Sequence, residues 1–313
     1  MGLLASFPLV AILGPTAVGK TDLSIRLAQE IRAEIVSFDS VQVYRGLDIG
    51  SAKPSRQEMD LVPHHMIDIV DPQEVLDAAT YASRAWARIK AIRRRGNNVV
   101  LVGGTGLYLK ALLQGLARIP SGDPFLRERL RAIARKRGKM ALYRMLGQVD
   151  PEALSRIHPE DLFRIIRALE VYIYTARPIS YWQRLHRQVQ RNQPCCIKIG
   201  LCRPRDELYQ RIEKRVDQMM QQGFLEEVKG LLEMGLDPRL RPLKSLGYRH
   251  IVDYLLGRYE LSEAMRLLKR DTRRYAKRQI TWFRADPLVR WFHPDHLRRA
   301  RSIWLSVMGG RDN

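Results

Sequence analysis

The segment "ILGPTAVGKTDL", residues 12–23, decides the fold class. It fits the pattern G-x-x-x-x-G-K-T, which begins at Gly14 and ends with Gly19, Lys20 and Thr21. The apolar run "PLVAIL" precedes the loop and predicts a buried parallel strand, and "TDLSIRLAQEI" follows it and predicts a helix. A glycine-rich loop between a strand and a helix points its backbone N–H groups at phosphate oxygens. The segment therefore predicts a polyphosphate site.

The residues of this loop have different expected tasks. The N-terminus of the following helix carries partial positive charge, which favours an anion. Lys20 is expected at the terminal phosphates, and the Thr21 hydroxyl is expected to ligate Mg²⁺. The motif does not say whether the phosphates are hydrolysed, transferred or released. The predicted diphosphate site is made of Gly14, Pro15, Thr16, Ala17, Val18, Gly19, Lys20 and Thr21.

The remaining chain divides into stretches of different character. Up to residue 116, strand-like runs ("AEIVSF", "HMIDIV", "NNVVLVGG") alternate with helix-like runs, which predicts right-handed crossovers and a parallel sheet. The chain then reads as helix to about residue 193, after which "CCIKIGLC" and "LVRWF" are expected to add strands. We therefore expect an α/β fold, a P-loop NTPase-like parallel sheet flanked by helices. Residues 1–116 and 194–313 would form this core, and residues 117–193 an inserted all-helical subdomain.

Charge is the second strong signal in the sequence. The formal net charge is +21, from 54 Lys and Arg against 33 Asp and Glu, and the isoelectric point is about 10.3. Residues 118–191 contain sixteen basic and seven acidic side chains, and residues 266–284 contain eight basic side chains and one acidic. A partner with many phosphates explains such an excess, and aromatic residues among the charges favour RNA. A basic surface that is merely solvated remains the alternative.

No part of the sequence predicts a membrane span or export. There is no run of about eighteen apolar residues, and "MGLLASFPLV" leads directly into the first strand without a cleavable signal. Cys195, Cys196 and Cys202 form neither a disulfide pattern nor a zinc pattern, and we expect buried, reduced thiols. A cytoplasmic protein is therefore expected.

Asp39 decides the chemistry, because it follows a predicted strand in "IVSFDSVQVY". Ligands of an open parallel sheet bind beyond the carboxyl ends of its strands, so Asp39 is expected next to the phosphate loop. It could hold Mg²⁺ through water, act as a general base, or only cap a turn. The later run "NVVLVGGTG" ends without an acidic residue, which weakens the interpretation as a hydrolase but leaves it open.

Eight segments together resemble one known family. In order they are "GPTAVGKT", "DSVQVYRGLDIGSAKP", "DIVDP", "GGTGLYLKALLQGL", "RALEVY", "LYQRIEKRVDQMMQQGFLEEV", "LGYRHIVDYLLG" and "AKRQITWFR". From Gly14 to Arg284 they follow the pattern of the tRNA dimethylallyltransferases, in the bacterial form without a zinc-finger tail. The resemblance implies transfer of a dimethylallyl group from its diphosphate to N6 of the adenosine immediately 3′ of the anticodon, with pyrophosphate released.

The resemblance also implies roles for particular residues. Asp39 matches the family's general base, and Thr16 and Arg215 match residues that reach the prenyl donor. The expected cofactor is Mg²⁺, and the expected partners are dimethylallyl diphosphate and the anticodon stem-loop of tRNA, bound by a monomer. The helical insertion resembles the family's clamp on the anticodon stem. The implied tRNA contacts are Asp39, Ser40, Val41, Gln42, Thr105, Arg127, Phe163, Arg164, Ile165, Ile166, Arg167, Lys244, Ser245, Leu246, Gly247, Tyr248 and Arg249.

Three positions depart from the family pattern. Phe38 is bulkier than expected before the Asp and could narrow the pocket or fill the core. Ala176 replaces a glycine at an expected helix end, at a modest cost, and His250 stands where Gln is common. Two other functions remain as alternatives: a prenyltransferase acting on adenine nucleotides, and an ATP-dependent RNA-binding protein or small-molecule kinase.

Overall fold

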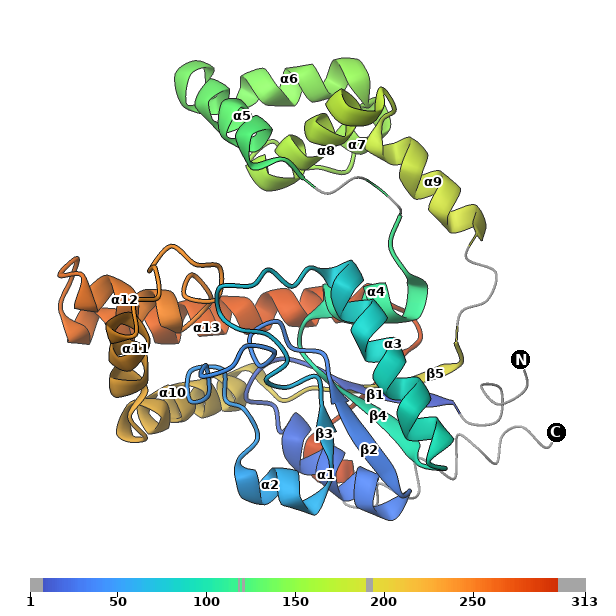
Figure 1. Cartoon of the computed structure of the whole chain (residues 1–313), viewed down its shortest axis with the longest axis vertical. Helices are drawn as coiled ribbons and strands as arrows, with labels where there is room; N and C mark the ends of the chain where they lie inside the picture. The colour runs from blue at the N-terminus through green and yellow to red at the C-terminus, as the bar shows by residue number, and fades with distance from the viewer. Residues whose placement is uncertain (1–7, 118, 120–121, 190–193, 298–313) are drawn as a thin grey trace. The chain divides into compact units, whose positions relative to one another are not determined.

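The computed structural model describes residues 8–117, 119, 122–189 and 194–297. The chain divides into two compact units, each with its own hydrophobic core (Figure 1). The core unit is formed by Met1–Leu113 together with Pro194–Asn313, and the helical unit is formed by Gln114–Gln193. The helical unit is thus inserted between two halves of the core unit, and its start lies three residues before the expected residue 117.

The core unit contains a sheet whose neighbouring strands are all parallel. The described strands follow the order β3-β2-β4-β1-β5-β6. Ala11 of β1 pairs with Leu101 of β4 on one side and with Lys198 of β5 on the other, so β1 lies inside the sheet. The predicted α/β class with a P-loop NTPase-like sheet is confirmed. The strands are β1 (Leu9–Leu13), β2 (Ala33–Ser37), β3 (His64–His65), β4 (Asn98–Gly103), β5 (Cys196–Leu201) and β6 (Val289–Phe292).

Helices connect and flank these strands. Local sequence sets several of their starts: Ser55 and Glu58 form a capping box at α2, and the Asp77 carboxylate accepts from the Thr80 N–H (2.7 Å) at α3. The described helices of this unit are α1 (Lys20–Glu30), α2 (Arg56–Leu61), α3 (Ala78–Arg94), α4 (Gly106–Gln114), α10 (Arg205–Gln221), α11 (Phe224–Glu233), α12 (Tyr248–Leu255), α13 (Leu261–Arg284) and the 3₁₀ helix η1 (Pro294–Leu297).

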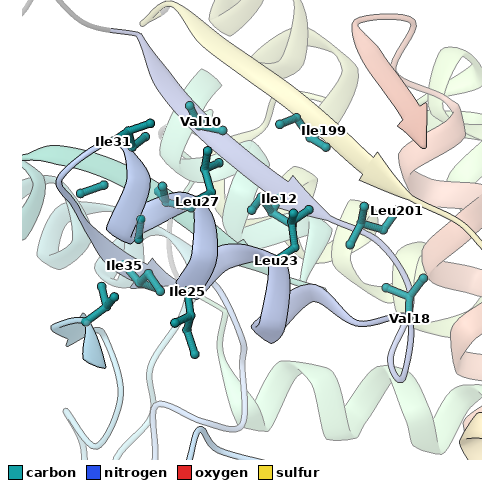
Figure 2. Packing of buried hydrophobic residues seen from close by; sticks show 14 of the residues in the cluster. Val10, Ile12, Val18, Leu23, Ile25, Leu27, Ile31, Ile35, Ile199 and Leu201 are labelled. Atoms are coloured by element: carbon teal, nitrogen blue, oxygen red, sulfur yellow. The ribbon is translucent and has the colours of Figure 1, made fainter. Parts of the chain in front are cut away.

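Figure 2 shows the apolar cluster that anchors the phosphate loop. Val10 and Ile12 point to the same face of the sheet, as the two-residue period of a strand requires. Leu23 and Leu27 of α1 belong to the same cluster. Val18, inside the loop, is fully buried there as well. The loop is therefore held by an apolar side chain in its middle and by buried elements on both sides.

The helical unit builds its core from the apolar faces of α5, α6 and α8. The carboxylates of Asp123 and Asp161 cap α5 and α8 by accepting from the N–H groups of Phe125 (2.7 Å) and Arg164 (3.1 Å). Helix α8 is followed by Ala176, whose φ of 50° is left-handed, so the predicted helix end is confirmed. Its helices are α5 (Pro124–Arg137), α6 (Lys139–Val149), α7 (Pro151–Leu154), α8 (Leu162–Thr175) and α9 (Ile179–Val189).

Two sequence predictions need correction. A strand was expected over "HMIDIV", but β3 contains only His64–His65. Met66 and Asp68 have φ angles of 65° and 55°, which an extended strand cannot contain. The short helix α7 was not predicted from the sequence. Residues 190–193, at the end of the expected helix "SYWQRLHRQVQRNQP", lie outside the described residues.

Candidate active site

Four chain segments leave the carboxyl edge of the sheet beside one another. They follow β1, β2, β4 and β5 and bring together the phosphate loop, Asp39, Thr105 and Arg203. Because all these strands are parallel, their carboxyl ends lie on the same edge, where an open α/β sheet binds its ligands. The structure therefore places Asp39 at the edge that the sequence predicted.

The phosphate loop turns through backbone conformations that glycine favours. Gly14 has a φ of 147° and Gly19 a φ of 103°, and Ala17 between them adopts a φ of 63°. A Cβ on Gly14 would meet the carbonyl oxygen of Leu201 at 2.7 Å, so the loop can follow β5 only with glycine at this position. Helix α1 then begins at Lys20, which puts its N-terminal amides beside the loop.

Cationic side chains donate hydrogen bonds to the carbonyl oxygens of this loop. Lys20 donates from Nζ to the carbonyl oxygens of Gly14 (3.1 Å) and Pro15 (2.7 Å). Arg211 donates from Nε to the carbonyl of Ala17 at 2.9 Å. In the same way, Nε of Arg203 donates to the carbonyl of Val18 at 3.1 Å. A peptide C=O and the N–H of the same unit point in opposite directions, so these bonds fix the directions of the loop amides.

Lys20, Asp39 and Arg215 interact electrostatically. Burial lowers the pKa of Lys20 most, Arg215 lowers it further and Asp39 opposes both, which leaves it at about 7. Burial also lowers the pKa of Arg215, and Asp39 again opposes the shift. These three groups therefore lie close enough to interact, and their net charge is positive when Lys20 is protonated. Such an arrangement suits a multiply charged anion.

A tight turn holds the Asp39 carboxylate. Its Oδ1 accepts hydrogen bonds from the N–H groups of Val41 (2.8 Å) and Gln42 (3.3 Å). Ser40 donates its N–H to Oγ1 of Thr105 at 3.1 Å, which ties this turn to the end of β4. Both amide bonds use Oδ1, so among the described contacts Oδ2 is the oxygen left to accept a proton.

Two residues of this site were missed by sequence reasoning. Gln279, buried on α13, accepts from the N–H of Thr16 (2.9 Å) and donates to the carbonyl of Gly104 (3.0 Å). Tyr275, one turn earlier, forms side-chain hydrogen bonds with Thr105 and Gln279, and burial, assisted by Asp39, raises its pKa. The segment "AKRQITWFR" supported the family resemblance, but nothing in it indicated contact with the phosphate loop.

The residues present fit a magnesium ion that takes most of its ligands from a bound diphosphate and water. Within the described ranges, no three His, Cys, Asp or Glu side chains come together to hold a metal ion by themselves. Thr21, the second residue of α1, follows Lys20 directly and offers a hydroxyl oxygen. Hard oxygen ligands of this kind suit Mg²⁺.

The predicted tRNA contacts of the helical unit fall into two groups. Phe163 is 72% exposed and the Arg164 side chain 61% exposed. Arg127 and Arg167, in the same unit, both pair with Glu170. The side chains of Ile165 and Ile166 are only 0% and 5% exposed and pack in the core of the unit, and their contact with tRNA stays a prediction.

The predicted contacts at residues 244–249 divide similarly. Lys244 and Arg249 are exposed, and Arg249 pairs with Asp271 at 2.5 Å. The Tyr248 side chain is fully buried and donates its hydroxyl to Glu227 (2.7 Å), and its contact with tRNA stays a prediction. Of the remaining members, Ser245 and Leu246 are half-buried, and Gly247 precedes α12 with a φ of 93°.

The unusual residues of the sequence have structural explanations. Phe38 is fully buried, and its ring packs where a Cβ on Gly103 would lie, so it fills the core. His250 is buried beside Asp271, with Nε2 3.2 Å from Oδ2, and burial lowers its pKa. Cys195 is exposed and Cys196 and Cys202 are half-buried, which corrects the expectation of buried thiols. No helix in the described parts of the chain is long and apolar enough to cross a membrane.

Comparisons with known proteins agree with one another. A family model described as IPP transferase matches residues 42–286. The chain is 52% identical over 285 residues to a tRNA dimethylallyltransferase of Syntrophobacter fumaroxidans. This match covers 91% of this chain and 83% of that protein. It is 49% identical over 302 residues to the tRNA dimethylallyltransferase of Geobacter sulfurreducens, covering 96% of this chain and 97% of the relative.

Solved structures give the same result. The crystal structure of the full-length tRNA isopentenylpyrophosphate transferase from Bacillus halodurans is similar with a TM-score of 0.67 and 43% identity, over 91% of this chain and 89% of that one. A eukaryotic dimethylallyltransferase acting on tRNA is similar with a TM-score of 0.72 and 30% identity, over 88% of this chain and 69% of that one.

Proposed function

The chain belongs to the family of the tRNA dimethylallyltransferases, and on that premise we propose that it transfers a dimethylallyl group from dimethylallyl diphosphate to N6 of the adenosine immediately 3′ of the anticodon in tRNA. One observation carries the proposal: a phosphate loop and a carboxylate meet at one edge of the sheet, and this carboxylate, Asp39, acts electrostatically on both Lys20 and Arg215. The loop would hold the diphosphate, and Asp39 would face the acceptor.

The acceptor amine needs a base. The exocyclic nitrogen of adenine is a poor nucleophile, because its lone pair is delocalised into the ring. Asp39 would take a proton from N6 through Oδ2 as the new nitrogen–carbon bond forms, while its turn keeps Oδ1 on the amides of Val41 and Gln42. The carboxylate then holds the proton that the amine has lost.

The leaving group needs positive charge. As the bond between the allylic carbon and the diphosphate oxygen breaks, negative charge collects on pyrophosphate. Lys20, Arg215 and the amides at the start of α1 would stabilise it, and Lys20 would exchange its contacts with the carbonyls of Gly14 and Pro15 for phosphate oxygens. A magnesium ion held by Thr21 would neutralise further charge on the diphosphate. Thr16 would lie against the prenyl donor, as its place in the phosphate loop suggests, and Gln279 would hold its backbone N–H in position.

The helical unit would bind the anticodon stem. Its basic excess is greatest on α5 and smaller on α6, α8 and α9, and the exposed ring of Phe163 suits an unpaired base. The target adenosine must leave its stack to reach a carboxylate at the edge of a sheet, as enzymes that act on bases generally require. Lys244 and Arg249 would add contacts to the same RNA, and a monomer would suffice.

The test is an assay with labelled dimethylallyl diphosphate and three alternative acceptors: tRNA, AMP and none. Label should appear in tRNA only. Transfer to AMP instead would indicate a prenyltransferase of adenine nucleotides. No transfer to either acceptor, with ATP cleaved in the presence of RNA, would indicate an ATP-dependent RNA-binding protein.

A further inference from the structure

The carboxylate of Glu170 is the most completely buried acidic group of the helical unit, at 0% exposure, and the proposed function gives it no role. It lies on α8, three residues after Arg167. Burying a carboxylate away from water costs free energy unless hydrogen bonds replace its hydration. Packing alone would be served as well by an apolar side chain, so the charge calls for another explanation.

Four donors satisfy this carboxylate completely. Oε1 accepts from Nε of Arg127 (2.9 Å) and from the N–H of Asp123 (2.7 Å). Oε2 accepts from Nη2 of Arg127 (3.1 Å) and from Nη1 of Arg167 (2.7 Å). Glu170 therefore binds Arg127 through two nitrogens, and this bidentate contact fixes the plane of the guanidinium as well as its position.

The two arginines held in this way line one cleft. A cavity of about 230 Å³ is bordered by both of them and by the exposed ring of Phe163. Arg131, Leu162 and Ile166 complete its wall. The Arg127 and Arg167 side chains keep 33% and 26% of their surface exposed, so each retains a face toward solvent. Arg131 pairs with the exposed Glu128 at 3.5 Å, so three cations and two anions leave the cleft with a net positive charge beside an aromatic ring.

We propose that Glu170 is a positioning residue for tRNA: it holds the guanidinium groups of Arg127 and Arg167 at the wall of this cleft, in place for backbone phosphates beside a base on Phe163. The inference rests on the proposed role of the helical unit in binding tRNA. Arginine side chains lose rotamer freedom when they bind, and a fixed pair has lost it already on folding. Backbone phosphates position an RNA, and unpaired bases stack on exposed rings.

The rival explanation is that Glu170 only fastens α8 to the start of α5. A substitution that removes the charge of Glu170 distinguishes this structural role from the positioning role. Glu170→Gln keeps the shape of the side chain and raises the net charge of the protein by one. Long-range attraction would then strengthen tRNA binding, whereas loss of the fixed arginines should weaken it, about tenfold for one charge-assisted hydrogen bond. The two effects have opposite signs.

A second variant moves Arg127 without altering any charge. A Cβ on Gly122 would lie 1.8 Å from Nη2 of Arg127, so Gly122→Ala must displace the tip of that side chain. It should weaken tRNA binding in the same direction as Glu170→Gln. Glu160→Gln is the matched control, because it removes an exposed carboxylate of the same unit that pairs only with Lys139 among the described contacts. It should bind as tightly as wild type, or more tightly.

The experiment is filter binding of tRNA to the full-length protein over a series of salt concentrations, with circular dichroism to confirm folding. Glu170→Gln and Gly122→Ala should bind about tenfold more weakly and give a shallower salt slope, by up to about 0.9 for each phosphate that the variant no longer binds. Glu170→Gln that binds as tightly as wild type would overturn the inference. Weaker binding with an unchanged slope would also overturn it. In that case the folded molecules make the same phosphate contacts and only fewer molecules are folded, so the role of Glu170 is structural.

Arg127→Ala separates this inference from the proposed function. If Arg127→Ala weakens binding and Glu170→Gln does not, only the positioning role is wrong. If Arg127→Ala binds as tightly as wild type, with the same slope, the proposed role of the helical unit is wrong as well. Should Glu170→Gln fail to fold, Gly122→Ala decides alone, and wild-type affinity in that variant contradicts the inference.

Discussion

At the scale of single residues, Asp39 carries the proposed chemistry. Asp39→Asn keeps the size of the side chain but removes the base, so turnover should fall by about 10²- to 10⁴-fold while tRNA affinity stays close to that of wild type. Single-turnover transfer of labelled prenyl groups measures the first quantity and filter binding the second. Asp71→Asn, at an exposed ion pair with Arg45, is the control and should leave both unchanged. Unaltered turnover in Asp39→Asn would remove this residue from the mechanism.

The lowered pKa of Lys20 predicts that affinity for the prenyl donor depends on pH. The pKa of this lysine is about 7 because burial and Arg215 disfavour the ammonium. The diphosphate binds the charged form, so affinity for the prenyl donor should be highest below pH 7 and fall by up to about tenfold per unit above it. Lys20→Arg keeps its charge at every pH and should give a flatter profile, even if its affinity is lower. A wild-type profile as flat as that of Lys20→Arg, measured by calorimetry between pH 7 and 9, would contradict the assignment.

The sequence predicts some site residues well because their spacing is local. The phosphate loop needs only neighbours in the chain, and Asp39 needs only its place after a strand. Gln279 could not be predicted, since it meets Thr16 across 263 positions of sequence. Burial of Ile165 and Tyr248 was missed for a related reason: a motif shared with a family does not distinguish side chains that bind from side chains that support.

At the scale of elements, α13 sets the distance between the phosphate loop and the acceptor side of the site. Gln279 links Thr16 to Gly104, and the next residue, Thr105, holds the turn that contains Asp39. Gln279→Leu keeps the volume but loses both bonds. We expect kcat to fall by about 10- to 100-fold, as a small misplacement of reacting groups allows, with tRNA affinity unchanged. Gln221→Leu, exposed on α10, is the control. A normal kcat in Gln279→Leu would show that α13 does not set this distance.

The end of α8 gives a prediction of stability. Ala176 is left-handed, which costs a non-glycine residue about 1–2 kcal/mol, and part of this cost is offset because alanine restricts the unfolded chain. Ala176→Gly should therefore raise the free energy of unfolding by about 0.5–1 kcal/mol, measured in urea. Ala132→Gly, exposed inside α5, should lower it by about 0.5–1 kcal/mol. Equal destabilisation by both variants would mean that Ala176 is not strained.

Most elements could be predicted from periodicity, and the failures have physical causes. The run "HMIDIV" is apolar enough for a strand, but left-handed turns at Met66 and Asp68 end β3 after His65. Propensity does not indicate such turns at Met. The helix α7 was missed because four residues are too few for a periodic pattern, although Asp150 caps its start and a proline opens it.

At the scale of the whole molecule, two units divide the expected work. The core unit contains the phosphate loop, Asp39 and α13, and the helical unit contains the cleft of Arg127 and Phe163. Their division could be predicted because strand-like runs stop near residue 116 and return near residue 194. The order of the strands could not, since β4 pairs with both β1 and β2 through contacts that no local pattern encodes.

The central claim is that the loop holds a prenyl diphosphate whose pyrophosphate leaves only when the prenyl group reaches tRNA. The most direct measurement counts both products of one reaction: pyrophosphate by an enzyme-coupled assay, and prenylated adenosine by mass spectrometry of the digested tRNA. We predict one pyrophosphate for each prenylated adenosine, located immediately 3′ of the anticodon, and none when tRNA is withheld. Pyrophosphate or phosphate released without prenylated tRNA would contradict the account.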